Sequence, residues 1–371
     1  MLLRLRASLS DSERHSILKL CKDLGYSPKF LGRAESLLEL EGAGSPENRS
    51  RLEDHTCVVQ VIETSESCEL TARPKQGEDT VITVGQARFG GGWASLIAGP
   101  CAVENIDRLL TIAGSVRNAG ATILRGGAYK PRTSPYSFRG LGGEALDYLA
   151  KAREETGLPI VSEVLDPRDV EAMGERVDMF QIGSRNMANA VLLNEVGKTS
   201  TPVLLKRGMA STVREFLLAA EYVLAAGNPN VILCERGVRG FDNVTRNLLD
   251  VGAIAFLKER THLPVIADPS HAAGRADLVA PIARAGIAAG ADGLIIEVHN
   301  APEEARSDGP QALSLDEFGR LATDVRALLA MDGRRLAGDA SADSNSTHSG
   351  DSDSNREEAD RPKSLEVKHH A

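Results

Sequence analysis

This 371-residue sequence has little cysteine, no long apolar run and no excess of basic charge. Its five cysteines are too few and too irregularly spaced for a disulfide framework in a chain of this length, which predicts free thiols. No window reaches the apolar length of a membrane-spanning helix, and residues 1–15 lack the apolar core and cleavage site of a signal peptide. These absences predict a soluble, globular, cytoplasmic protein.

The charge balance is acidic, with 43 Lys and Arg against 52 Asp and Glu. Residues 337–371 hold eight acids and four Lys or Arg, so this stretch supplies nearly half of the net charge of -9. Nothing in this balance indicates a nucleic-acid partner. The stretch from residue 335 to residue 371 is polar, low in complexity and free of aromatic residues, which predicts a disordered acidic tail of unassigned function.

Residues 1–74 are predicted to form a small α+β domain. Ser10 and Glu13 have capping-box spacing at the start of a first helix, and Gly25 stands where its C-terminal cap belongs. A second helix is expected to open at Ser45 with Pro46 in its first position. Strand-like runs flank these helices at residues 2–7, 29–31, 37–40, 57–62 and 68–72. That order predicts a ferredoxin-like fold, either regulatory or merely a structural appendage.

Residues 75–93 are predicted to be a linker in which Val81–Val84 and the Gly90–Gly92 cluster form a hairpin that closes onto the next domain. From residue 94 to residue 334, short apolar runs alternate with helix-length segments. The runs are residues 94–101, 121–126, 159–164, 179–183, 202–206, 231–235, 264–268 and 293–298. Eight such units predict a (β/α)8 TIM barrel, an α/β fold whose strands are buried on both faces. Its helices include residues 212–226, and the last should end near Met331.

Nearly every one of these runs ends at a chemically reactive residue. In chain order the exits are Cys101, Arg125 with Lys130–Ser134, Glu163, Arg185, Lys206, Glu235 with Arg236, Asp268 with His271, and Glu297 with His299. Because barrel enzymes carry their active sites at the carboxyl ends of the strands, this coincidence predicts the catalytic end of the barrel.

The exits fall into two chemical groups. One is cationic and includes the segment LRGGAYKPRTSPYSFRG, in which glycines, cations and the hydroxyls of Thr133 and Ser134 suit a phosphate. Its cations exceed what one phosphate needs, which predicts two anionic groups or substrates. They are Lys130, Arg132, Arg185, Lys206 and Arg236.

The other group offers a thiol, an imidazole and carboxylates, a mixed donor set that suits a divalent transition metal. Its members are Cys101, His271, Glu297 and Asp308. Taken singly, Cys101 could be a small buried apolar residue and Asp308 a loop cap.

With these residues identified, the chain resembles the 3-deoxy-D-arabino-heptulosonate 7-phosphate (DAHP) synthases of the type I beta branch. The motifs that carry the resemblance run in order from residue 98 to residue 313. They are AGPCAVEN, RGGAYKPRTSPYSFRGLG, QIGSRNMAN, PVLLKRGMAST, ILCERGVRGFD, DPSHAAGRADLV and GLIIEVHNAPEEARSDGPQAL. The first 74 residues also resemble the ferredoxin-like regulatory domain that some members carry.

The resemblance implies a transferase that condenses phosphoenolpyruvate with D-erythrose 4-phosphate and water, giving DAHP and phosphate at the entry to the shikimate pathway of aromatic amino acid biosynthesis. It implies that the metal, commonly manganese, zinc, iron or cobalt, is held by Cys101, His271, Glu297 and Asp308. It assigns phosphoenolpyruvate to Lys130, Arg185, Lys206 and Arg236, and the phosphate of erythrose 4-phosphate to Arg132, Thr133 and Ser134. On this layout Lys130 is the candidate proton donor, and Glu163 or Glu235 positions the water.

Small departures from the family pattern, at Ala102, Ser162, Ser184 and Asn300, remove no charged or ligating group. One alternative is the sister enzyme that makes 3-deoxy-D-manno-octulosonate 8-phosphate, which shares the barrel and the phosphoenolpyruvate chemistry. Another is a catalytically silent barrel that senses a ligand. The resemblance also implies a homotetramer, and the N-terminal module suggests feedback inhibition by an aromatic amino acid.

Overall fold

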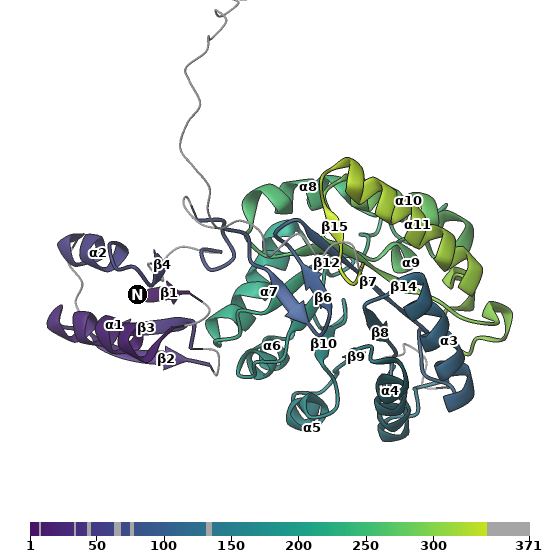
Figure 1. Ribbon diagram of the computed structural model, residues 1–371, viewed down its shortest axis with the longest axis horizontal. Coiled ribbons are helices and arrows are strands. Elements are labelled where there is room, and N and C mark those ends of the chain that lie inside the picture. Colours follow the sequence, from purple (N-terminus) through teal and green to yellow (C-terminus); the bar gives the residue numbers. More distant parts are fainter. Residues whose placement is uncertain are drawn as a thin grey trace, which may run out of the picture.

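The computed structural model describes residues 1–6, 9–32, 35–42, 46–62, 68–74, 78–130 and 136–339. The predictions for Arg132, Thr133, Ser134 and the tail beyond residue 339 lie outside the described residues. A small antiparallel sheet lies beside a larger closed barrel, next to helices α6 (Ala190–Gly197) and α7 (Val213–Ala225) (Figure 1). No helix among the described residues is both long and apolar enough to span a membrane. All five cysteines are free, as predicted.

The N-terminal unit has the ferredoxin-like topology that the sequence predicts. Its four strands pair antiparallel in the order β2-β3-β1-β4. In chain order its elements are β1 (Leu2–Leu5), α1 (Asp11–Asp23), β2 (Ser27–Leu31), β3 (Leu37–Glu41), α2 (Pro46–Glu53) and β4 (Val58–Ile62). Helix α1 buries Ile17 and Cys21 in the core that it forms with the sheet.

The predicted caps of α1 are confirmed, whereas one predicted strand is wrong. Ser10 and Glu13 form the reciprocal capping box, and Gly25 follows the C-cap with a φ of +84°, a conformation that favours glycine. Residues 68–71 form turns instead of the strand expected at residues 68–72. Cys68 takes a φ of +70°, and the Thr71 N–H donates to a carboxylate of α7 at 2.7 Å, so neither can continue a strand.

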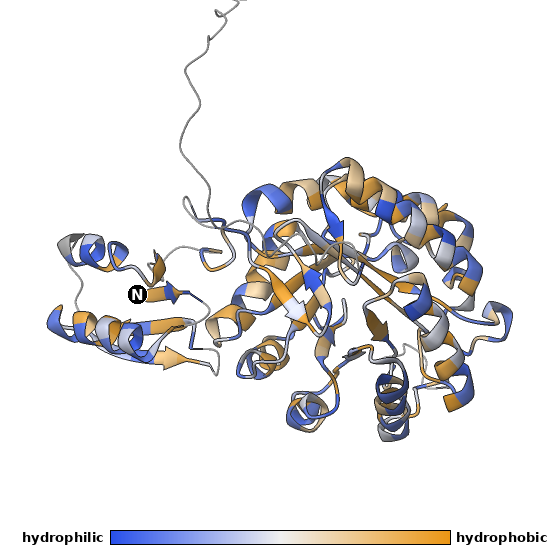
Figure 2. Cartoon of the chain, viewed as in Figure 1, coloured by the Kyte–Doolittle hydropathy of each residue, from blue (hydrophilic) through white to orange (hydrophobic). Residues whose placement is uncertain are grey.

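The barrel contains eight parallel strands, and β14 pairs with β7 to close it, so the prediction of a (β/α)8 fold is confirmed. The strands are β7 (Trp93–Gly99), β8 (Ile123–Arg125), β9 (Ile160–Glu163), β10 (Met179–Ile182), β11 (Val203–Lys206), β12 (Val231–Glu235), β13 (Val265–Ala267) and β14 (Gly293–Glu297). They appear as the apolar centre of the barrel in Figure 2. Beyond the predicted end of the barrel at residue 334, β15 (Arg335–Leu336) pairs parallel with β7.

Amphipathic helices cover the barrel and return the chain from each strand to the next. Besides α6 and α7 they are α3 (Ile106–Ala119), α4 (Gly143–Thr156), α5 (Val170–Gly174), α8 (Val251–Arg260), the short α9 (Pro269–Ala273), α10 (Ala276–Ala288) and α11 (Leu315–Met331). Helix α7 starts at a Thr212–Glu215 capping box and buries Phe216, Ala220 and Val223, as its sequence stripe predicts. Helix α11 ends at Met331, where it was expected to end.

The predicted hairpin is also confirmed and seals one end of the barrel. Strands β5 (Ile82–Val84) and β6 (Ala87–Phe89) pair antiparallel and pack Ile82 and Phe89 against the inward aliphatic side chains of the barrel strands. Gly85 and Gly90 lie against Pro159 and Pro264, which directly precede β9 and β13. The hairpin therefore closes the amino ends of the strands and leaves the carboxyl ends for the site.

The N-terminal unit meets the barrel backbone to backbone. Gly32, at a φ of +66°, is so close to Gly227 that a Cβ on Gly32 would lie 2.5 Å from the Gly227 Cα. Buried His262, which lies just before β13, bonds the Leu70 carbonyl at 2.8 Å and the Thr80 hydroxyl at 2.6 Å. Burial lowers the pKa of His262 to about 4, so the imidazole is neutral at this junction.

Candidate active site

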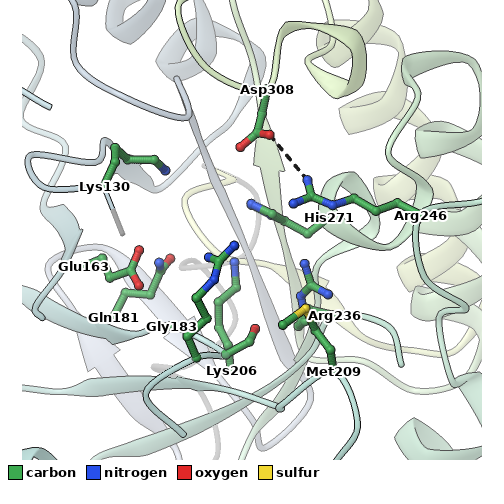
Figure 3. A pocket seen from close by; sticks show the side chains of 12 residues that line it. Lys130, Glu163, Gln181, Gly183, Lys206, Met209, Arg236, Arg246, His271 and Asp308 are labelled. Carbon is green, nitrogen blue, oxygen red and sulfur yellow. Dashed lines mark hydrogen bonds and ion pairs between the residues drawn. The ribbon is translucent and has the colours of Figure 1, made fainter. Parts of the chain in front are cut away.

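One pocket lies at the carboxyl ends of the barrel strands and collects side chains from seven of the eight strand exits (Figure 3). Its lining residues are Lys130, Glu163, Gln181, Gly183, Ser184, Arg185, Lys206, Met209, Arg236, Arg246, His271 and Asp308. Parallel strands bring their carboxyl ends to a single rim, which is why residues far apart in sequence meet here.

Cations dominate the pocket. Lys206 ends β11 and pairs with Asp268, while Arg236 follows β12; both side chains are buried. Burial lowers the pKa of Arg236, because the charged form has lost water. Arg185 and Lys130 complete a group of four predicted cations around one cavity. Cations packed this closely are suited to an anionic ligand that replaces the lost solvation.

A candidate metal cluster adjoins the pocket. The Cys101 Sγ and carboxylate oxygens of Glu297 and Asp308 all lie within 4.8 Å of one another. The Cys101 thiol donates to Asp308 Oδ2 at 3.0 Å, and the His271 Nε2 is 3.3 Å from Glu297 Oε1. Three of the four residues predicted as metal ligands, Cys101, Glu297 and Asp308, thus form one cluster, and His271 lies beside it through its contact with Glu297.

The donor atoms of this cluster fit a divalent ion. Glu297 Oε1 is buried and accepts no hydrogen bond, with only the ion-pair neighbours Arg125 and His271 beside it. Thiol, imidazole and carboxylate together suit zinc, manganese, iron or cobalt. Burial and the neighbouring Glu297 carboxylate raise the pKa of Cys101 to about 12. A divalent ion reverses this effect, because it stabilises the thiolate.

Asp268 connects the cation group to the metal cluster. Its carboxylate contacts the Lys206 ammonium and lies 2.8 Å from His271 Nδ1. Burial opposes the charge on Asp268, but His271 and Lys206 outweigh it and hold the pKa of Asp268 well below its usual range. The pKa of His271 is itself lowered by burial, which favours the neutral imidazole that binds metals. Asp268 fits the role of a carboxylate that orients a metal-binding histidine.

The two glutamates proposed to position water occupy different surroundings. Glu163 lines the pocket, and a Cβ on Gly183 would lie 1.9 Å from its Oε1, so glycine leaves the space that this carboxylate occupies. Glu235 is fully buried and is not among the described residues that line the pocket. It accepts hydrogen bonds from Arg207 at 2.8 Å and from the Gly237 N–H at 2.7 Å.

Some residues of the site were missed by sequence reasoning. Arg246 lines the pocket and contacts Asp308 and Gln311 at 3.4 and 3.1 Å, yet it lies in the long connection between β12 and α8, away from any strand end. Gln311 donates to Glu297 Oε2 at 2.6 Å. Arg125, noted only as a strand exit, lies 3.1 Å from Glu297 Oε1. The available signal was membership of a motif, since Gln311 lies in SDGPQAL and Arg125 opens RGGAYKPRTSPYSFRGLG, whereas Arg246 lies in none of the motifs.

A barrel with cations and a mixed thiol, imidazole and carboxylate cluster at its carboxyl rim defines an enzyme for anionic substrates with a candidate divalent-metal centre. The comparison with known families identifies the enzyme family to which the chain belongs. The chain belongs to the DAHP synthetase I family, whose model matches residues 70–330.

Individual relatives agree with this family. The phospho-2-dehydro-3-deoxyheptonate aldolase of Thermotoga maritima is 41% identical over 329 residues, covering 88% of this chain and 97% of the relative. The crystal structure of that aldolase, also described as a DAHP synthase, superposes with a TM-score of 0.71 at 39% identity, covering 90% of this chain and 98% of the other. The 2-dehydro-3-deoxyphosphooctonate aldolase of Geobacter sulfurreducens is 31% identical and covers 67% of this chain and 98% of its own length.

Proposed function

We propose that this chain is a 3-deoxy-7-phosphoheptulonate synthase, a transferase that condenses phosphoenolpyruvate with D-erythrose 4-phosphate and water to give DAHP and phosphate. The observation that carries the proposal is that a four-cation pocket and a candidate metal cluster share one side chain, Lys130, which lines the pocket and lies 3.0 Å from the Cys101 Sγ. An anionic enol phosphate and an aldehyde must come together in this reaction, and Lys130 lies where the pocket meets the residues that would hold the metal.

Phosphoenolpyruvate is assigned to the cations of the pocket. It carries a phosphate and a carboxylate, and Lys130, Arg185, Lys206 and Arg236 supply enough donors for both. Lys206 and Arg236 are buried, so the ligand charge replaces lost hydration and strengthens these contacts. The phosphate of erythrose 4-phosphate is assigned to Arg132, Thr133 and Ser134, which remains a prediction from the sequence.

The metal is assigned to Cys101, His271, Glu297 and Asp308, where a divalent ion supplies the Lewis acidity that polarises an aldehyde oxygen. The chain itself supplies the proton. Burial opposes the charge on Lys130, but Cys101 and Glu297 outweigh it and raise the pKa of Lys130, so its Nζ carries a proton at neutral pH. Lys130 then donates that proton to the alkoxide formed when the new carbon–carbon bond closes.

Water has to add to the electron-poor carbon of the former phosphoenolpyruvate before phosphate leaves. Glu163 is the better of the two glutamates for positioning this water, because its carboxylate faces the pocket while that of Glu235 is occupied by Arg207 and Gly237. Glu235 instead keeps Arg207 in place, 2.8 Å away, at the end of β11. The metal identity stays open between manganese, zinc, iron and cobalt.

The N-terminal unit is proposed to be regulatory, with an aromatic amino acid as feedback inhibitor and a homotetramer as the working assembly. Its support is the ferredoxin-like topology, a fold that the type I beta branch uses for regulation, together with its direct backbone contact with the barrel at Gly227. A variant that starts at residue 78 should keep turnover and lose inhibition by tyrosine or phenylalanine. Inhibition that survives the deletion contradicts the regulatory role.

The function is tested by the loss of phosphoenolpyruvate absorbance in metal-stripped protein, before and after manganese is added. Erythrose 4-phosphate is the substrate in one cuvette and arabinose 5-phosphate in a parallel one. Metal-dependent loss with erythrose 4-phosphate alone supports the proposal. Loss with arabinose 5-phosphate favours octulosonate synthesis, and loss with neither sugar favours a silent, ligand-sensing barrel.

A further inference from the structure

Glu104 lies three residues beyond Cys101 and joins two segments of the candidate metal cluster. Its side chain is only 5% exposed, and both carboxylate oxygens are in use. Oε1 accepts from the Arg306 N–H at 2.7 Å, and Oε2 accepts from Arg108 at 2.7 Å. Arg108 in turn bonds Glu304 at 2.6 Å. The segment after β7 is thus fastened to the segment after β14, which carries Asp308.

This attachment matters because of the backbone at Asp308. Asp308 has a φ of +54°, a left-handed conformation that costs a non-glycine residue free energy and persists only where the surroundings enforce it. Arg306 lies two residues before it, and Ser307 places its Oγ 3.2 Å from the Cys101 Sγ. Holding the Arg306 N–H therefore fixes the turn that aims the Asp308 carboxylate at Cys101.

The Arg306 side chain extends the connection to the third segment of the site. Its guanidinium lies 3.9 Å from the centre of the Phe138 ring, a cation–π contact. Phe138 precedes Arg139, whose carbonyl accepts the Lys130 N–H at 2.9 Å. Lys130 returns to Cys101, with its Nζ 3.0 Å from both the Sγ and the carbonyl oxygen of that residue. The contacts form a closed ring around the cluster.

We propose that Glu104 is a positioning residue of this enzyme. It holds the Asp308 turn in the geometry that binds metal, through the Arg306 N–H on one oxygen and Arg108 on the other. The inference rests on the proposed function, because it takes the metal cluster from there.

The test for Glu104 uses Co²⁺ alone, titrated into metal-stripped protein and followed by the thiolate-to-cobalt charge-transfer band of Cys101. Glu104→Gln keeps the shape but cannot accept from both Arg306 and Arg108, so Co²⁺ affinity should fall about 10- to 100-fold. The matched control is Glu303→Gln, in the same segment and exposed, which should bind Co²⁺ like the parent protein. Equal affinity of the Glu104 and Glu303 variants overturns the role of Glu104.

The same titration separates failure of this inference from failure of the proposed function. A parent protein that binds Co²⁺ without a charge-transfer band has no thiolate ligand, which overturns the metal centre and this inference with it. A parent band that is unchanged in Glu104→Gln overturns the inference alone. Matching thermal unfolding midpoints of parent and variants show that the compared proteins are folded.

Discussion

The two ends of the barrel are built from the same strands and differ completely in chemistry. At the amino end, inward side chains form an aliphatic layer against the β5–β6 hairpin. Two residues further along the same face, the layer becomes polar or charged. The pairs are Ile123 and Arg125, Val161 and Glu163, Met179 and Gln181, Leu204 and Lys206, and Ile295 and Glu297. Two residues of strand, about 7 Å, separate the layer that holds the barrel from the layer that can react.

Because the two neighbouring layers differ in chemistry, we expect substitutions in the aliphatic layer to change stability and substitutions in the charged layer to change activity. The carboxyl end accepts buried charge only because its groups neutralise one another, as Asp268 does for Lys206 and His271. The amino end has no such constraint and is held by apolar packing.

The largest effect is expected for Cys101→Ser at the carboxyl end. Serine is a far weaker ligand for a borderline metal than thiolate, so metal binding and turnover should be lost together. Metal content by atomic spectroscopy and turnover with added manganese check this. Cys234→Ala, which removes a buried thiol from the aliphatic layer, should retain both metal and turnover. An active, metal-free Cys101→Ser protein would eliminate the ligand set.

At the amino end, Phe89→Ala should lower the free energy of unfolding by about 3–5 kcal/mol, because it opens a cavity beneath the aliphatic layer. The KM values of the remaining folded protein should not change. Chemical denaturation measures the loss, and Phe241→Ala, at a fully exposed aromatic residue of the other end, is the control with no expected loss. A large change in KM would mean that the two layers are not separable.

Lys130→Met should lower kcat about 1000-fold, since it removes the proposed proton donor while keeping most of the length of the side chain. Steady-state kinetics with saturating metal check the prediction. Binding of phosphoenolpyruvate should weaken as well, because Lys130 is one of the four cations of the pocket. Full turnover of this variant would refute the donor assignment.

Glu163→Gln and Glu235→Gln compare two glutamates of the charged layer, one that lines the pocket and one that is buried behind it. Glu163→Gln should lower kcat about 100-fold with little change in stability, because its carboxylate faces the pocket. Glu235→Gln should instead lower the free energy of unfolding by about 1–3 kcal/mol, because Arg207 loses a buried charged partner. Steady-state kinetics and chemical denaturation of both variants show which glutamate positions the water. A large loss of kcat in Glu235→Gln with none in Glu163→Gln would assign the water to Glu235.

The smallest effect concerns pH and His262, just before β13 at the amino end. Its pKa falls from 6.5 to about 4 on folding, so its contribution to stability is present above pH 6.5 and lost as the pH drops towards 4. Between pH 7.5 and 5 this amounts to about 2 kcal/mol. His262→Gln should lose less stability than the parent over this range, as measured by denaturation at both pH values. Parallel losses would contradict the prediction.

The sequence predicted the elements whose signal is local. The apolar runs located the eight strands, and capping boxes located the starts of α1 and α7. The predictions that failed did so because contacts between residues far apart in the sequence decide the local structure. Residues 68–72 contain enough apolar residues for a strand, but buried Leu70 lies in a turn. The carbonyl of Leu70 bonds His262, which is nearly two hundred residues further along the chain.

The residues of the candidate site likewise divide into those that the sequence could predict and those that it could not. Residues at strand ends could be predicted because the fold brings all strand ends to one rim. Arg246 and Glu104 could not, because each lies inside a connection and acquires its contacts with Asp308 or Arg306 only after folding. The roles of Arg132, Thr133 and Ser134 stay predictions.

The contact between Gly32 and Gly227 constrains how this protein can evolve. Both glycines have positive φ, and each occupies the space that a Cβ on the other would need. A methyl group gained at either position would act as a wedge and separate the N-terminal unit from the barrel without altering any residue of the pocket. The junction therefore offers selection, or an engineer, a way to change how the two units are joined that is chemically independent of catalysis.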